Sequence, residues 1–131
     1  MILADSSAWI EYDRATESPT DRALTDLVDS RNQELAVTEP VLMEVLAGAR
    51  TEERSAKLER LLRSFQWIPA DPVADFVGAA KLYRACRRSG ITPRSLNDCL
   101  IATIALRTGS HILAADRDFA DIATIVPLRL V

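Results

Sequence analysis

The sequence predicts an α/β fold: one domain built on a five-stranded, mostly parallel sheet that is flanked by helices. Short apolar segments of strand character alternate with longer segments of helical periodicity along the whole chain, and this alternation is typical of a parallel sheet covered on both faces. The chain has 131 residues, of which 48% are hydrophobic and 27% charged, which suits a globular domain with a real core. No linker-like or repeated segment divides residues 1–131, so we predict a single domain.

The chain is expected to begin with one strand and two helices. The segment ILA at residues 2–4 is a short apolar run of the kind found in buried strands. The hydroxyls of Ser6 and Ser7 can cap a helix that starts at Ala8, because they accept hydrogen bonds from the free N–H groups of a first turn. A proline in the first turn and apolar residues at helical spacing predict an amphipathic helix over residues 19–32.

A second strand and two further helices are expected next. The segment ELAVT at residues 34–38 has strand character, and its last residue, Thr38, can cap a helix over residues 40–49. Residues 51–65 carry leucines and a phenylalanine on one side and charged residues on the other, which predicts a surface helix.

A third strand and two long helices are expected in the middle of the domain. The segment WIP at residues 67–69 is a candidate short strand. Helical patterns follow over residues 72–90 and from Ser95 to about Thr108. Each pattern is ended by a glycine, the residue that most readily adopts the left-handed conformation of a helix C-terminus.

The last part of the chain is expected to hold two strands on either side of a short helix. The strands are HILAA at 111–115 and PLRLV at 127–131, and the helix is DFADIATI at 118–125. Sheets of this kind place ligand sites beyond the carboxyl ends of their strands, where the strand order reverses. Asp5 and Asp116 each follow a predicted strand, so their carboxylates would face one crevice if these two strands are neighbours.

Four acidic residues stand where acids are unusual. Asp5 and Asp116 follow strands. Glu44 lies in an otherwise uncharged helix, and Asp98 precedes the uncharged run CLIATIAL. Each has an ordinary explanation of its own, as a turn residue, a helix cap or a first-turn acid. Together they predict a cluster, and because two carboxylates about 4 Å apart repel by about 4 kcal/mol at an effective dielectric of 20, such a cluster either holds protons or binds a cation.

The residue types favour a hard divalent cation and hydrolysis. Mg²⁺, with Mn²⁺ as the alternative, takes oxygen ligands, often one or two carboxylates together with water and phosphate oxygens. The only histidine, His111, has no cysteine or second histidine with which to bind zinc, and the common nucleophile and phosphate-loop motifs are absent. Hydrolysis of a phosphodiester by metal-activated water suits the carboxylates that remain.

The charge of the chain bears on its partners. A formal net charge of −3 argues against a polyanionic partner, but the predicted cluster includes four of the acids, and a metal would offset them. Basic residues flank two of these acids, where phosphate contacts would be useful, although solvated helix faces are the alternative. Arg50, Arg54, Lys57, Arg60 and Arg63 follow Glu44, and Arg84, Arg87, Arg88 and Arg94 precede Asp98.

A cytoplasmic location without membrane contact is expected. No apolar run approaches the ~20 residues of a membrane span, and the N-terminus lacks the basic start of a signal peptide. Cys86 and Cys99 fit two reduced thiols rather than a disulfide framework.

Four segments, in their order and spacing, resemble the motifs of PIN-domain ribonucleases, and among these the VapC-type toxins of bacterial toxin–antitoxin pairs: ILADSSAWI, EPVLMEVLAG, SLNDCLIATIAL and HILAADRDF. The resemblance covers essentially the whole chain. It implies a five-stranded parallel sheet between helices, and it places the family's acids on Asp5, Glu44, Asp98 and Asp116. It further implies that Asp5 and Asp98 are the principal Mg²⁺ ligands and that the other two complete the pocket directly or through water.

The resemblance also implies supporting residues and partners. Ser7 and Asn97 match polar positions that help to hold the site. The substrate would be structured cellular RNA, the chain would form a homodimer, and a small cognate antitoxin would insert a basic side chain into the acidic pocket. One position departs from the family: Ala114 stands where Thr or Ser is usual. This leaves Asp116 versus Asp118 open as the fourth acid, with Asp116 preferred for its spacing from the following phenylalanine.

The same residues bear on other functions of proteins of this size and class. A response-regulator receiver needs paired acids at the first strand and a lysine after a late strand, and a haloacid-dehalogenase-type phosphatase needs an acid where Ser7 stands; the chain meets neither requirement. A non-catalytic module that docks a basic partner in the acidic pocket is an alternative. A DNA-directed nuclease is another, because the residues carry no readable mark of recognition of the 2′-OH of RNA.

Overall fold

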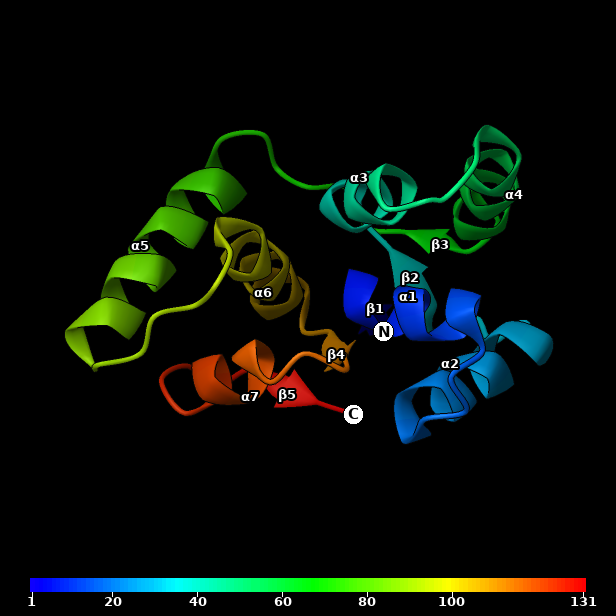
Figure 1. The fold of residues 1–131 in the computed structure, drawn as a ribbon. Coiled ribbons are helices and arrows are strands. Elements are labelled where there is room, and N and C mark those ends of the chain that lie inside the picture. The colour runs from blue at the N-terminus through cyan, green and yellow to red at the C-terminus, as the bar shows by residue number, and fades with distance from the viewer.

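The computed structural model describes residues 1–131 and contains one five-stranded sheet (Figure 1). The strands are β1 (Ile2–Ala4), β2 (Leu35–Val37), β3 (Gln66–Trp67), β4 (His111–Leu113) and β5 (Arg129–Leu130). Their order is β3-β2-β1-β4-β5, and every neighbouring pair is parallel. Leu3 of β1 pairs with Ala36 of β2 on one side and with Ile112 of β4 on the other. β1 is therefore the central strand, and the strand order reverses between β1 and β4.

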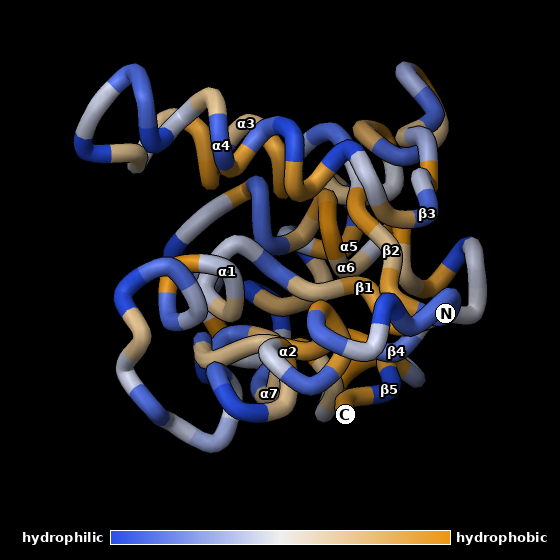
Figure 2. Tube along the Cα trace, turned by 90° about the vertical axis from the view of Figure 1, so that its right-hand side faces the viewer, coloured by the Kyte–Doolittle hydropathy of each residue, from blue (hydrophilic) through white to orange (hydrophobic).

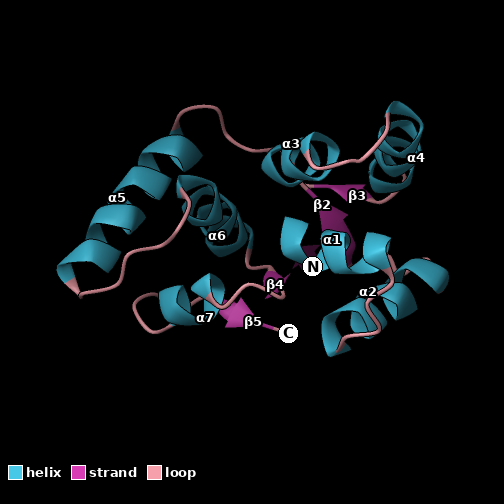
Figure 3. Ribbon diagram, in the orientation of Figure 1, coloured by secondary structure: helices cyan, strands magenta, loops and turns pink.

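Seven helices connect the strands and cover the sheet. They are α1 (Ser6–Arg14), α2 (Pro19–Asp29), α3 (Glu39–Ala47), α4 (Glu52–Arg63), α5 (Ala74–Arg88), α6 (Leu96–Thr108) and α7 (Asp118–Ala123). Figures 1 and 3 show α1 and α2 on one side of the sheet and α5 and α6 on the opposite side. This arrangement follows from right-handed crossovers, because the chain moves outward from β1 to β3 and then returns past β1 to β4.

The core is apolar and lies on both faces of the sheet. Leu3 and Leu35 on neighbouring strands are fully buried, as expected of parallel strands, which read as continuous apolar runs rather than alternating ones. Trp9 of α1 is fully buried, with its ring centroid 5.7 Å from that of Tyr12 and 6.1 Å from that of Phe65. Figure 2 shows hydrophobic residues gathered in the central strands, while hydrophilic residues predominate on the outer loops and helix faces.

The predicted strands and helices are all present in the predicted order, most of them with shorter bounds. β1 keeps its predicted bounds, α1 and α3 begin earlier than predicted, and β3 lies at Gln66–Trp67 instead of 67–69. The sheet is entirely rather than mostly parallel. The predicted strands at 34–38 and 127–131 shrink to β2 and β5, because only their central residues pair with a neighbouring strand. Cys86 and Cys99 are free and buried, in agreement with the prediction. None of the helices combines the length and apolar character that a membrane crossing needs.

The start of α1 differs from the prediction. Asp5, and not Ser6 or Ser7, is the N-cap: its Oδ2 accepts a hydrogen bond from the Ser7 backbone N–H at 3.0 Å. The helix therefore begins before Ala8. Thr38 occupies the N-cap position of α3, as expected, but its side chain makes no capping hydrogen bond. Carboxylates cap helices as well as hydroxyls do, so the local pattern could not choose between neighbouring polar residues.

Helix α5 packs closely on α6 through a glycine and an ion pair. A Cβ on Gly78 would lie 2.8 Å from Thr103 Cγ2 of α6. Asp75 is buried and accepts two hydrogen bonds from the Arg107 guanidinium at 2.9 and 2.8 Å. Burial raises the pKa of Asp75, but hydrogen bonds from Arg107 and the Asp71 backbone outweigh it and leave the pKa below its usual value. The position of α6, which carries Asp98, is thus set by tight packing and by a paired buried charge.

We expect Gly78→Ala to lower the free energy of unfolding by about 1–3 kcal/mol, because the added methyl group meets Thr103 Cγ2. Thr103→Ser removes that methyl group and keeps the hydroxyl, which donates to the Cys99 carbonyl at 2.7 Å. In the Thr103→Ser background, Gly78→Ala should be neutral or stabilising by up to about 1 kcal/mol, because alanine is the better helix former. Urea denaturation of the four chains measures both effects, and an equal loss in the two backgrounds would contradict this account of the packing.

Candidate active site

The candidate site lies at the carboxyl ends of β1 and β4, the neighbouring strands between which the strand order reverses. Asp5 directly follows β1, and Asp116 lies in the loop after β4. The backbone N–H of Asp5 donates to the Leu113 carbonyl at 2.9 Å, which ties the two strand ends together. β1 and β4 are therefore neighbouring strands, as the predicted crevice between Asp5 and Asp116 required.

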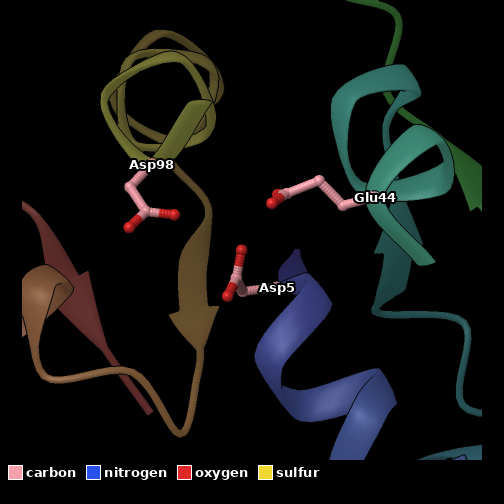
Figure 4. A group of neighbouring side chains, drawn as sticks. All are labelled: Asp5, Glu44 and Asp98. Carbon is pink, nitrogen blue, oxygen red and sulfur yellow. The ribbon is translucent and has the colours of Figure 1, made fainter. Parts of the chain in front are cut away.

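Three carboxylates from separate elements converge there, and we call them the first group: Asp5 after β1, Glu44 of α3 and Asp98 in the first turn of α6 (Figure 4). Each offers an oxygen, and these oxygens lie within 4.8 Å of one another. Figure 4 shows the Asp5 carboxylate pointing toward the space between the other two. Asp5 and Asp98 are buried, and Glu44 is partly buried.

Two hydrogen bonds orient Glu44. Its Oε1 accepts from the Ser6 hydroxyl at 3.0 Å and from the Asn97 side-chain amide at 2.6 Å. Asn97 also donates to the Pro40 carbonyl at 3.3 Å, so it fastens the start of α6 to α3. Sequence reasoning identifies Asn97 but misses Ser6, because a serine beside a helix start is an ordinary capping residue and nothing local shows that it reaches α3.

A second group of acids shares Asp98. Oxygens of Asp98, Asp116 and Asp118 also lie within 4.8 Å of one another. Asp118 is buried, and its backbone N–H donates to Asp116 Oδ1 at 2.9 Å. Both candidates for the fourth acid are thus at the site. The Ser7 hydroxyl accepts from the backbone N–H groups of Ala115 and Asp116 at 3.0 and 3.2 Å, which holds their loop against α1.

One basic side chain reaches these acids. Arg94 Nη2 donates to Asp116 Oδ1 at 2.7 Å, and Arg94 Nε lies 3.5 Å from Asp118 Oδ2. The basic residues after Glu44 behave differently, since three of them form ion pairs with acids outside the site. These pairs are Arg54 with Asp13, Lys57 with Glu53, and Arg63 with Glu59. The pairs of Lys57 and Arg63 lie within α4 and favour the alternative of a solvated helix face, whereas Arg54 reaches from α4 to Asp13 of α1.

Burial and mutual repulsion oppose full ionisation of the acids. Burial raises the pKa of Asp98 from its usual 3.8 to about 8, with further contributions from the charges of Asp5 and Asp116. Burial also raises the pKa of Asp5, although hydrogen bonds from Ser7 oppose the shift. Asp5 Oδ1 is buried and has no hydrogen-bond partner. A buried carboxylate oxygen without a donor is costly, so a positive charge would be favoured beside it.

The donor atoms of the first group fit a hard divalent cation. All of them are carboxylate oxygens, which Mg²⁺ and Mn²⁺ prefer. The unpartnered Asp5 Oδ1 is available as a ligand, and neighbouring oxygens of Glu44 and Asp98 lie within 4.8 Å. A cation among them would also relieve the repulsion that raises the pKa of Asp98.

Known proteins resemble this chain along nearly its whole length. The family model described as "PIN domain" matches residues 2–125. Ribonuclease VapC11 of Mycobacterium tuberculosis is 44% identical over 129 residues, which cover 98% of this chain and 96% of that protein. A VapC ribonuclease of Mycobacterium bovis shows the same identity and the same coverage.

Solved structures resemble it in fold. VapBC2 of Rickettsia felis, solved bound to a DNA fragment from its promoter, matches with a TM-score of 0.76 and 20% identity, covering 100% of this chain and 98% of that chain. The M. tuberculosis toxin VapC20, which cleaves the sarcin-ricin loop, matches with a TM-score of 0.68 and 19% identity, covering 98% of this chain and 99% of that one. By its sequence and its fold, the chain belongs to the PIN-domain family and, within it, to the VapC-type ribonucleases.

Proposed function

We propose that this protein is a metal-dependent endoribonuclease and the toxin of a toxin–antitoxin pair, with Mg²⁺ as its cofactor and Mn²⁺ able to replace it. The observation that carries the proposal is the first group of acids, in which the buried Asp5 Oδ1 has no donor while oxygens of Glu44 and Asp98 lie within 4.8 Å. Relatives with 44% identity over nearly the whole chain are named ribonucleases, which supports RNA as the substrate.

We assign Asp5 and Asp98 as the principal metal ligands, with Glu44 and Asp116 completing the pocket directly or through water. A bound divalent ion would polarise the phosphodiester and lower the pKa of the attacking water. The chain itself positions the carboxylates. Two hydrogen bonds hold Glu44 Oε1 in the pocket, and Asp98 lies in the first turn of α6. Without a cation, the Asp98 carboxyl keeps its proton below about pH 8.

We further propose two protein partners, a second copy of the chain and a small antitoxin. The similar structure from R. felis contains a VapBC pair. Carboxylates form strong charge-assisted hydrogen bonds with guanidinium groups, which supports inhibition by a basic side chain inserted into the pocket. Large apolar side chains exposed on or beside α3, α5 and α6 also support contacts with other proteins. These are Met43, Val73, Phe76, Val77 and Leu96.

Cleavage of RNA tests the activity. The purified chain, free of partners, should cut bacterial total RNA into discrete fragments in Mg²⁺, and EDTA should abolish the cutting. Asp98→Asn should slow it at least about a hundredfold, because a metal contributes several kcal/mol to transition-state stabilisation. Asp121→Asn is the matched control: Asp121 is an exposed acid of α7 outside both groups, and its variant should cut at the wild-type rate.

Two results would redirect the proposal. If a folded chain leaves RNA intact in both Mg²⁺ and Mn²⁺, the pocket is better explained as a docking site for a basic partner. If single-stranded DNA is cut as fast as RNA of the same sequence, the DNA-directed alternative is favoured.

The stability of the metal-free protein should depend on pH through Asp98. Its folded pKa of about 8 exceeds the unfolded value of about 3.9, so the folded state binds this proton more tightly and loses stability as pH rises from about 4 to 8. Asparagine cannot ionise, so in EDTA at pH 8 the Tm of Asp98→Asn should exceed that of the wild type by about 5 °C or more. The difference should shrink toward pH 4.

Scanning calorimetry at several pH values, with EDTA or with Mn²⁺, measures this effect. Mn²⁺ should raise the Tm of the wild type by mass action and have little effect on Asp98→Asn. If the Tm of the wild type increases relative to that of Asp98→Asn as pH rises, or if Mn²⁺ does not change the Tm of the wild type, the assigned role of Asp98 is contradicted.

Growth of a bacterial host tests the role as a toxin. Induced expression of the wild type without an antitoxin should stop growth, because cleavage of cellular RNA halts protein synthesis. Asp98→Asn, expressed to the same level, should leave growth unchanged. Growth arrest by both chains at equal levels would show that toxicity does not come from this site.

A further inference from the structure

Arg94 lies between α5 and α6, and its guanidinium rests on the second group of acids. Its Nη2 donates to Asp116 Oδ1 at 2.7 Å, and its Nε lies 3.5 Å from Asp118 Oδ2. The backbone N–H of Arg94 donates to the same Asp118 oxygen at 2.9 Å. The side chain is 69% exposed, so these contacts are made at the surface and are not needed to fill the core.

The two groups of acids differ in how their oxygens are engaged. In the second group, Asp116 Oδ1 accepts from both Arg94 Nη2 and the Asp118 backbone N–H. In the first group, Asp5 Oδ1 accepts no hydrogen bond, and none of the ion pairs of the protein reaches Asp5 or Glu44. Positive charge is therefore already present at one half of the site and absent from the other half.

We infer that Arg94 is a built-in cation that takes the place of a second divalent ion, so that the site holds one divalent ion, at Asp5, Glu44 and Asp98. This inference rests on the proposed metal-dependent function and deepens it. A guanidinium keeps its charge at every pH at which the protein is folded. It therefore repels a second cation from Asp116 and Asp118, and it occupies an oxygen that such an ion would need as a ligand.

The number of Mn²⁺ ions bound per chain tests the inference without reference to activity. Electron paramagnetic resonance of free Mn²⁺, titrated with metal-free protein at pH 8, measures this number. The wild type should bind one ion per chain. Arg94→Ala should bind two, and Arg94→Ala combined with Asp118→Asn should return to one. Arg88→Ala is the matched control, because Arg88 is an exposed arginine of α5 without an ion pair; it should bind one ion.

The failure of this inference is distinguishable from the failure of the proposed function. Two ions in the wild type, or a single ion in Arg94→Ala that is folded by circular dichroism, would overturn the inference and leave the metal-dependent nuclease standing. A wild type that binds no Mn²⁺ at millimolar concentration would overturn the metal centre itself, and the inference with it. Loss of the single wild-type ion in Asp5→Asn would assign that ion to the first group, because Asp5 belongs to that group alone.

Discussion

Carboxylates crowded together beyond the carboxyl ends of β1 and β4 repel one another, and the other contacts of the site offset this repulsion. Two charges about 4 Å apart repel by about 4 kcal/mol at an effective dielectric of 20, and Asp98 belongs to both groups of acids. The structure offsets the repulsion with neutral donors from Ser6 and Asn97 and with the guanidinium of Arg94, and the pKa of Asp98 is raised, which favours its protonated form. Asp5 Oδ1 alone has no such partner. A proton, a metal ion or a guanidinium group would each neutralise this pocket, which connects the proposed chemistry of the site to its proposed inhibition.

Keeping repelling groups together requires a rigid frame, and α6 provides it. Most of its residues are buried, because it packs against α5 and lies over the sheet (Figure 1). The contact between Gly78 and Thr103 and the ion pair between Asp75 and Arg107 fix α6 against α5. Asp98 consequently cannot relax into water, and the same burial raises its pKa and leaves it available to a cation. Stability is commonly sacrificed in this way at functional sites.

Local patterns in the sequence were sufficient to predict the elements and most of the candidate site. Apolar runs of strand length, first-turn prolines and terminal glycines predict the strands and helices in their observed order. An acid in or directly after an apolar segment is visible in the sequence itself, which is why Asp5, Glu44 and Asp98 could be named before their positions were known. Asp116 follows a predicted strand, but the preference for it over Asp118 came from the resemblance to the family. The predicted strands at 34–38, 111–115 and 127–131 were too long because strand character is a local property, whereas pairing depends on the neighbouring strand.

Local sequence patterns are therefore enough to predict the order of elements, the α/β class and the acids beside apolar segments. What each acid contacts depends on how distant elements pack together. The tertiary structure places Asp118 beside Asp116, brings the Ser6 hydroxyl to Glu44 across separate helices, and lays Arg94 on one half of the pocket. These contacts depend on strand order and helix packing, which arise from burial shared among distant segments. No single segment contains that information, because periodicity specifies which face of an element is buried and not which partner covers it.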